Sequence, residues 1–312
     1  MRLGFLYAGQ GTQHPGMGLD LYTAFSSFRE VFDGAEPGFD LKSVCFTDPD
    51  GVLSQTEYTQ PCMVAFAAGM TAVLRQFGIS PAVAAGLSLG EYSALHAAGV
   101  WDAQTAIQTV AFRGQAMAGA ARGVDCAMVA VLGLSRDALS QVCTEASALG
   151  VAELCNYNCP GQIVIGGEAG AVARAAELAK ERGAKRCLPL KVSGPFHTSL
   201  LKSAGDALRE YFCSVPFETP TIPVLFNCLG REMGPEDTIP ALLERQVYSS
   251  VYLEDCIRRM GELGVDAVVE IGPGRALSGF VRKTVPELRV FAVETAEEVL
   301  LLPELLKEVE NI

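Results

Sequence analysis

The segment Ala82-Val83-Ala84-Ala85-Gly86-Leu87-Ser88-Leu89-Gly90-Glu91-Tyr92 sets a serine between an apolar run and a segment of helical character. Residues 86–90 form a Gly-x-Ser-x-Gly pattern. Between a strand and a helix this pattern is typical of a nucleophile elbow, because the glycines permit a strained turn that exposes the hydroxyl at the helix N-terminus. Such a match also arises by chance in a glycine-rich chain, so the strand before it and the helix after it are what favour a nucleophile.

Around this segment, apolar runs and helical segments alternate in the manner of an α/β protein. In the first third we expect strands at residues 3–8 and 82–87 and helices at 19–34, 59–77, from 89 onward, and 101–121. Further strands are expected at 221–228, 267–271 and 289–293. Together these elements predict one large α/β subdomain made of residues 1–124 and 193–312.

The intervening segment, residues 125–192, follows a different order. It predicts strand 128–134, helix 136–147, strands 152–157 and 162–166, helix 171–182 and strand 186–192. The order β-α-β-β-α-β is the ferredoxin-like arrangement. We therefore expect a small ferredoxin-like subdomain inserted in the large one.

Composition excludes several classes of function. A net charge of −12 disfavours nucleic-acid binding, which needs a basic surface. The apolar stretch 63–74 is too short to span a bilayer, and the N-terminal segment is too short for a signal peptide, so we expect a cytoplasmic protein without a membrane span. The ten cysteines lack zinc or redox spacing, which predicts reduced thiols and no metal site.

Ser88 needs a general base, and the chain has three histidines. His96 lies two helical turns beyond Ser88, too far to fold back to the hydroxyl, and is expected to be structural. His14 follows the turn Gly9-Gln10-Gly11-Thr12-Gln13 and could line a site. His197 lies where the inserted segment rejoins the large subdomain, a favoured place for a cleft, so position favours His197 over His14.

The oxyanion formed during acyl transfer needs backbone donors. One is usually the amide that follows the nucleophile, here Leu89, and the other comes from a neighbouring loop. The glycine-rich turn after the first strand is suited to present the second from Gln10, although a plain strand-to-helix turn would look the same.

Taken in order, these motifs resemble the malonyl-coenzyme A:acyl carrier protein transacylases of fatty acid synthesis and the acyltransferase domains of polyketide synthases. The resemblance covers essentially the whole chain. It rests on residues 9–13, 86–92, Arg113, the segment Asn156-Tyr157-Asn158-Cys159-Pro160-Gly161-Gln162, Phe196-His197, Gln246, and Glu270-Ile271-Gly272-Pro273-Gly274. It implies an α/β-hydrolase-like large subdomain with a ferredoxin-like insert.

The resemblance also implies roles. Ser88 is the expected nucleophile, His197 the base, and the amides of Gln10 and Leu89 the oxyanion hole. Arg113, which on sequence alone reads as a surface residue, becomes the expected anchor of the malonyl carboxylate. Gln246 matches the residue whose main-chain carbonyl orients the histidine.

Leu87 departs from the family, many members of which carry histidine before the nucleophile, so we expect intact chemistry with an altered pocket wall. Phe196 resembles the malonyl-selective pattern, although simple packing would explain it equally well. The expected substrates are malonyl-coenzyme A and phosphopantetheinylated acyl carrier protein, with no further cofactor.

Three other functions stay open: a polyketide acyltransferase acting in trans, a serine thioester hydrolase, and a non-catalytic docking module. A hydrolase would normally supply an acidic third residue where this chain has Gln246. Retention of Ser88, His197 and Arg113 together speaks against a docking module. Residues 171–202 carry a local excess of basic side chains, so the acidic carrier protein is expected to dock near Lys185 and Arg186, unless the cluster is an ordinary solvated face.

Overall fold

The computed structural model describes residues 1–310, which fall into two compact units. The first comprises Met1–Gly114, Pro216–Phe226 and the chain from Cys256 onward, and the second comprises Gln115–Val215 and Asn227–Asp255. The limits 1–124, 125–192 and 193–312 expected for the subdomains stay a prediction. No helix within residues 1–310 is long and apolar enough to cross a bilayer.

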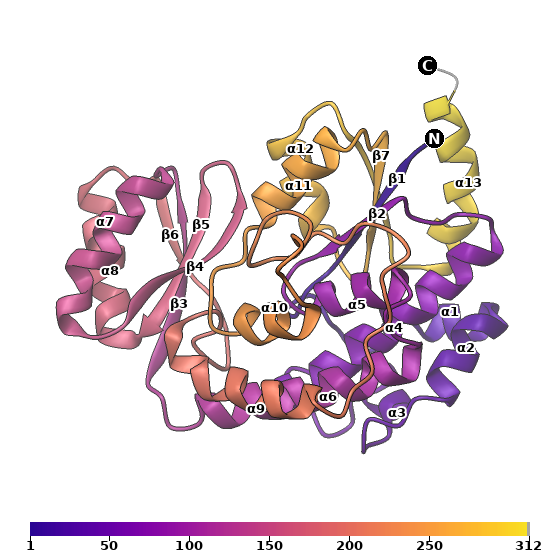
Figure 1. Cartoon of the computed structure of the whole chain (residues 1–312), viewed down its shortest axis with the longest axis horizontal. Coiled ribbons are helices and arrows are strands. Elements are labelled where there is room, and N and C mark those ends of the chain that lie inside the picture. Colours follow the sequence, from indigo (N-terminus) through magenta and orange to yellow (C-terminus); the bar gives the residue numbers. More distant parts are fainter. Residues whose placement is uncertain (311–312) are drawn as a thin grey trace. The chain divides into compact units, whose positions relative to one another are not determined.

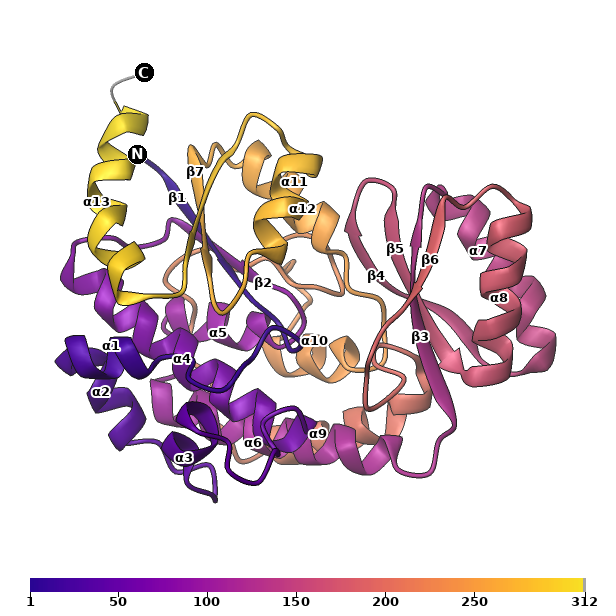
Figure 2. The same cartoon turned by 180° about the vertical axis from the view of Figure 1, so that it is seen from behind.

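The first unit contains a parallel sheet in the order β2-β1-β7-β8. Its strands are β1 (Leu3–Tyr7), β2 (Val83–Gly86), β7 (Ala267–Ile271) and β8 (Arg289–Val293). All five residues of β1 are buried, as expected of a central strand covered on both faces. Figures 1 and 2 show α11 and α12 on one side of this sheet and α13 on the other.

The helices that begin before the second unit are α1 (Leu19–Ala24), α2 (Ser26–Asp33), α3 (Leu41–Phe46), α4 (Thr56–Gln76), α5 (Gly90–Ala97) and α6 (Ala103–Ala121). Those that end after it are α11 (Leu253–Glu262), α12 (Ala276–Thr284) and α13 (Ala296–Glu310). The helix expected over residues 19–34 is interrupted at Phe25, which is extended with φ −125° and ψ 122° and cannot continue the α1 backbone.

The strand expected at residues 221–228 does not form as a ladder. Ala84 of β2 makes a single bridge to Val224, with hydrogen bonds from Ala84 N to Pro223 O and from Leu225 N to Ala84 O. Pro223 has no N–H to extend the pairing, so the prediction of a full strand was wrong.

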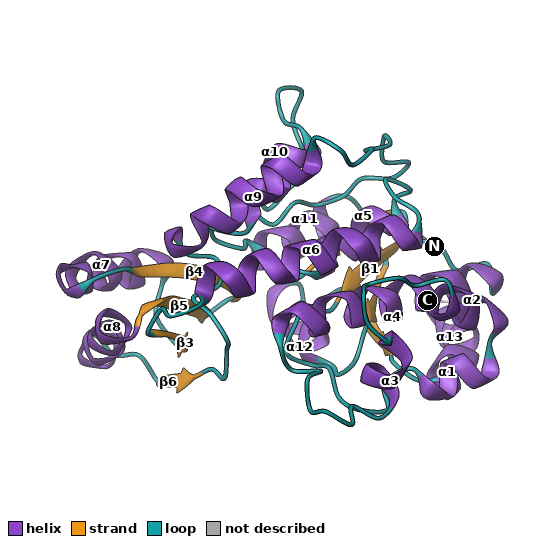
Figure 3. Ribbon diagram, turned by 90° about the horizontal axis from the view of Figure 1, so that it is seen from below, coloured by secondary structure: helices purple, strands orange, loops and turns teal. Residues whose placement is uncertain are grey.

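The second unit contains an antiparallel sheet in the order β4-β5-β3-β6. Its elements are β3 (Cys126–Leu132), α7 (Arg136–Ala146), the 3-10 turn η1 (Ser147–Leu149), β4 (Ala152–Cys159), β5 (Gln162–Glu168), α8 (Ala169–Glu181) and β6 (Arg186–Pro189). This is the ferredoxin-like order. One face of the sheet packs on α7 and α8 through a cluster that includes Val131, Leu139, Ile165 and Val172 (Figure 3).

After β6 the second unit continues through the 3-10 turn η2 (Ser199–Leu201) into α9 (Lys202–Phe212) and, further along the chain, α10 (Ile239–Gln246). These two helices pack on each other. His197 lies two residues before η2, and Gln246 is the last residue of α10.

Candidate active site

The Gly-x-Ser-x-Gly segment forms a strained turn between β2 and α5. Ser88 has a φ of +52°, in the left-handed region that a residue with a side chain adopts only when its surroundings require it. A Cβ on Gly86 would lie 2.0 Å from the Gly90 carbonyl carbon, and a Cβ on Gly90 would lie 2.2 Å from the Tyr7 carbonyl oxygen. Both glycines are therefore required, and the predicted elbow is present.

The loop after β1 lies directly against this elbow. A Cβ on Gly9 would be 2.5 Å from the Leu87 carbonyl oxygen, so the two backbones touch. The Gln10 side chain donates from Nε2 to Thr56 Oγ1 at 3.0 Å, which fixes the loop on the first residue of α4. Within the described chain the backbone amides of Gln10 and Leu89 donate to no protein acceptor. Their role as an oxyanion hole stays a prediction.

Arg113 of α6 is buried beside Ser88. Its side chain is 1% exposed, its Nη2 donates to Ser88 Oγ at 3.1 Å, and its guanidinium lies 5.1 Å from the centre of the Tyr92 ring. Burial lowers the pKa of Arg113, whereas the nearby Tyr92 and Glu91 act in the opposite direction. The interpretation of Arg113 as a surface residue, made from its own helix alone, was therefore wrong.

His197 and Gln246 lie together in the second unit. His197 is 4% exposed with a φ of +63°, and its Nδ1 lies 2.8 Å from the main-chain carbonyl oxygen of Gln246. A carbonyl oxygen can only accept, so Nδ1 carries the proton and the lone pair of the neutral ring is on Nε2. That tautomer is the one a general base needs.

Phe196, the residue before His197, is partly buried against a small apolar cluster of the second unit. The members of this cluster are Met128, Ala130, Cys155 and Val164. These contacts account for an aromatic side chain at this position through packing, and a role in excluding branched acyl groups stays a prediction.

The other two histidines are engaged elsewhere. His14 is half exposed, with Nε2 at 2.6 Å from Glu294 Oε1 and Nδ1 at 3.0 Å from the Pro15 carbonyl oxygen. Both partners are acceptors, so both bonds can form only when both ring nitrogens carry protons, and the hydrogen bond to Glu294 raises the pKa of His14. Burial lowers the pKa of His96, whose Nδ1 donates to the Trp101 carbonyl oxygen, in agreement with a structural role.

The motif Glu270-Ile271-Gly272-Pro273-Gly274 builds the framework of the site. The buried Glu270 carboxylate accepts from the backbone N–H groups of Leu277 and Ser278 in the first turn of α12, although burial raises its pKa. Gly272 has a φ of +141°, and a Cβ there would lie 2.4 Å from Ala8 Cβ. The motif therefore holds the end of β7 against the end of β1.

Two residues with a part in this geometry were not assigned a role from the sequence. Thr56 receives the Gln10 side chain, and Tyr92 lies under the guanidinium of Arg113. No sequence pattern pointed to either residue, because both contacts join segments far apart in the chain. Among the described residues no group of three or more His, Cys, Asp or Glu side chains could hold a metal ion.

Comparison with known proteins identifies the family over nearly the whole chain. A family model described as "Acyl transferase domain" matches residues 4–312. The chain belongs to the acyl transferase family. The malonyl CoA-acyl carrier protein transacylase of Bacillus subtilis (strain 168) is 39% identical over 310 residues, which cover 98% of each chain.

Solved structures of this family superimpose closely on the chain. The transacylase of the same name from Clostridium perfringens gives a TM-score of 0.95 at 38% identity, with 99% of this chain and 98% of that one covered. A malonyl-transacylase in complex with its type II polyketide acyl-carrier protein gives 0.93 at 36% identity, covering 97% and 99%. The acyltransferase fold, an α/β-hydrolase-like part with a ferredoxin-like insert, is confirmed.

The close contacts of this acyltransferase elbow predict a large effect of one methyl group. Gly90→Ala is expected to lower the free energy of unfolding by about 3 kcal/mol or more, because the new Cβ would overlap the Tyr7 carbonyl. Gly119→Ala is the matched control, since a Cβ added at that exposed glycine of α6 would meet open space. The control should gain about 0.5–1 kcal/mol from helix propensity. Urea denaturation measures both, and equal midpoints would contradict the strained elbow.

Proposed function

We propose that this acyltransferase moves a malonyl group from malonyl-coenzyme A to the phosphopantetheine thiol of an acyl carrier protein, through an ester on Ser88. The observation that carries the proposal is the buried Arg113 guanidinium, 3.1 Å from Ser88 Oγ. One methylene separates the thioester carbonyl of malonyl-coenzyme A from its free carboxylate, so a cation that recognises this group has to lie close to the nucleophile. The names of the relatives support the same substrate.

In the proposed first half-reaction, Ser88 Oγ attacks the thioester carbonyl carbon and its proton passes to His197 Nε2. The oxyanion accepts hydrogen bonds from the amides of Gln10 and Leu89, and Arg113 turns from Ser88 Oγ to the malonyl carboxylate. The carbon–sulfur bond then breaks, and the coenzyme A sulfur leaves with the proton from His197. The malonyl group is now an ester of Ser88.

The second half-reaction reverses these steps with a new thiol. The phosphopantetheine thiol of the carrier protein gives its proton to His197 and attacks the ester carbonyl carbon. The serine leaves, recovers the proton, and the malonyl thioester of the carrier protein is released. The reaction exchanges an ester and two thioesters, so we propose that no further cofactor takes part.

Transfer is favoured over hydrolysis by the partner of the histidine. In this chain Nδ1 of His197 meets the neutral main-chain carbonyl of Gln246, where a hydrolase triad has a carboxylate. The related transacylase in complex with a polyketide carrier protein supports a second candidate, the same transfer in polyketide synthesis. Because all ten cysteines are free thiols, as is usual in a reducing compartment, we propose a cytoplasmic location.

The proposed nucleophile and base predict distinct losses. Ser88→Ala should abolish the covalent malonyl adduct, and His197→Ala should slow its formation by roughly a thousandfold or more. Ser54→Ala, which removes an exposed hydroxyl, should label normally. Mass analysis of the intact protein after brief exposure to malonyl-coenzyme A measures the adduct, and full labelling of Ser88→Ala would exclude Ser88 as the nucleophile.

Arg113 is predicted to set the choice of acyl group. Arg113→Ala should lower kcat/KM for malonyl-coenzyme A by about a hundredfold or more, because the substrate carboxylate would be buried without a partner. Activity toward acetyl-coenzyme A should rise relative to malonyl, and Arg113→Lys should rescue only partly, since it lacks the two-pronged donor. Arg122→Ala, an exposed arginine just after α6, is the control. An unchanged ratio of the two kcat/KM values would refute this role.

We further propose that the carrier protein docks near Lys185 and Arg186. The seven basic residues of segment 171–202 divide into two groups. Arg174, Arg182 and Lys202 form ion pairs. In the described chain no ion pair is found for Lys180, Lys185, Arg186 or Lys191. Unpaired surface cations are available to steer an acidic partner.

Reversing both charges, with Lys185→Glu and Arg186→Glu, should slow transfer to the carrier protein and weaken its salt dependence, with self-acylation by malonyl-coenzyme A near normal. The control reverses the exposed pair Arg282 and Lys283 of α12. Rates of the two half-reactions are measured separately at two salt concentrations. Equal loss in both half-reactions would contradict a docking role.

A further inference from the structure

We propose that Glu244 is a positioning residue for His197. Through bonds to α9 it holds the last turn of α10, so that the Gln246 carbonyl oxygen stays on Nδ1 of the histidine. The inference rests on the proposed function in one respect, the use of His197 as the base.

Both residues of the His197–Gln246 hydrogen bond lie close in the sequence to the helix pair α9 and α10. Lys202, the first residue of α9, follows His197 by five positions, and Glu244 precedes Gln246 by two, in the last turn of α10. A bond between Lys202 and Glu244 therefore fixes the backbone close to both partners.

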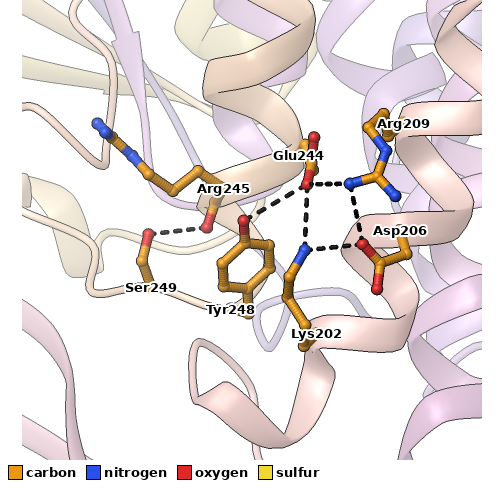
Figure 4. Close-up of polar contacts among 7 residues, drawn as sticks. All are labelled: Lys202, Asp206, Arg209, Glu244, Arg245, Tyr248 and Ser249. Atoms are coloured by element: carbon orange, nitrogen blue, oxygen red, sulfur yellow. Dashed lines mark hydrogen bonds and ion pairs between the residues drawn. The ribbon is translucent and has the colours of Figure 1, made fainter.

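Glu244 is the most buried charged group of a four-residue ring of alternating sign (Figure 4). Its side chain is 15% exposed, and Oε1 accepts from Lys202 Nζ and from Arg209 Nη1, each at 3.2 Å. Asp206 Oδ1 closes the ring with contacts of 2.7 Å to Lys202 Nζ and 3.1 Å to Arg209 Nη1. Both cations and Asp206 belong to α9, so Glu244 is the member that ties this ring to α10.

The backbones of the two helices are also in contact at this point. A Cβ on Gly205 of α9 would lie 2.5 Å from the Tyr248 ring and 3.1 Å from the Glu244 carbonyl oxygen. The Tyr248 ring lies 4.6 Å from Lys202 Nζ, and its hydroxyl points to Glu244 (Figure 4). The Glu244 carboxylate therefore lies where α9 and α10 touch, so that a small movement of α10 would also move α9.

A restraint is needed because α10 is short. It spans eight residues, and the carbonyl groups of its last turn have no partner within the helix. Gln246 O is one of them, and its bond with Nδ1 of His197 satisfies it. If this turn moves, the imidazole loses the acceptor that selects its tautomer, and the base becomes a mixture of two ring forms.

The test compares Glu244→Gln and Glu244→Ala with Glu210→Gln. Glu210 is an exposed carboxylate of α9 without an ion pair in the described chain, so the control removes the same charge from the same unit. Ser88 acylation by malonyl-coenzyme A should slow about tenfold or more in Glu244→Ala, with substrate affinity unchanged. Glu244→Gln, which retains the shape and one acceptor, should be intermediate, and Glu210→Gln should match the wild type.

A second measurement reports on the histidine directly. With ¹⁵N-labelled histidine the chain gives three imidazole spectra, and the one absent from His197→Gln belongs to His197. In the wild type at neutral pH, its Nδ1 should have the shift of a protonated nitrogen and its Nε2 that of an unprotonated one. In Glu244→Ala the two shifts should move toward each other. A structural role elsewhere would slow acylation without this change.

An unchanged tautomer together with an unchanged acylation rate in Glu244→Ala would overturn the proposal. If the alanine variant loses its fold, as judged by circular dichroism, the same two readouts on Glu244→Gln decide. If malonyl-coenzyme A fails to acylate the wild-type protein, the proposed function is wrong, and the tautomer measurement alone decides the positioning role of Glu244.

Discussion

The contact between backbone atoms at Gly86, Gly90 and Tyr7 is the constraint on which the first unit depends. It leaves no room for a Cβ on either glycine, and it holds Ser88 at a positive φ at the start of α5. The contact exists because β1 runs between β2 and β7, all parallel, so three loops leave the same edge of the sheet. Functional groups collect at the carboxyl ends of such strands, and here these are the Gln10 loop, the serine and the Gly272 turn.

Burial of the Arg113 side chain next to this turn has an energetic cost. A guanidinium that is 1% exposed is costly unless hydrogen bonds and neighbouring charge offset the loss of water. Ser88 Oγ, the face of the Tyr92 ring and the charge of Glu91 supply part of this compensation. A fork-shaped donor is suited to a carboxylate ligand, which agrees with the proposed role of Arg113 in the choice of acyl group.

The sequence predicted elements well where one signal dominated. The strands 267–271 and 289–293 have the expected limits because each is a short apolar run bounded by turns. Prediction failed where the outcome depended on one backbone group, as with the missing N–H of Pro223 or the extended Phe25. The burial of Arg113 could not be read from its own helix, since it arises from contacts with Ser88, 25 positions earlier, and with Tyr92 of α5. Only the resemblance to a family anticipated it.

The choice of histidine shows why position along a chain is a weak guide to chemistry. His14 and His197 both follow strands and turns, yet His14 meets an acceptor with each nitrogen and His197 meets the Gln246 carbonyl with Nδ1. Both bonds of His14 can form only when both of its ring nitrogens are protonated, whereas the bond of His197 needs a proton on Nδ1 alone. The orienting group at position 246 is a main-chain atom, so no side-chain pattern could identify it. What the sequence has to specify is the position of the last turn of α10, and the bonds of Glu244 to Lys202 and Arg209 of α9 are the proposed means.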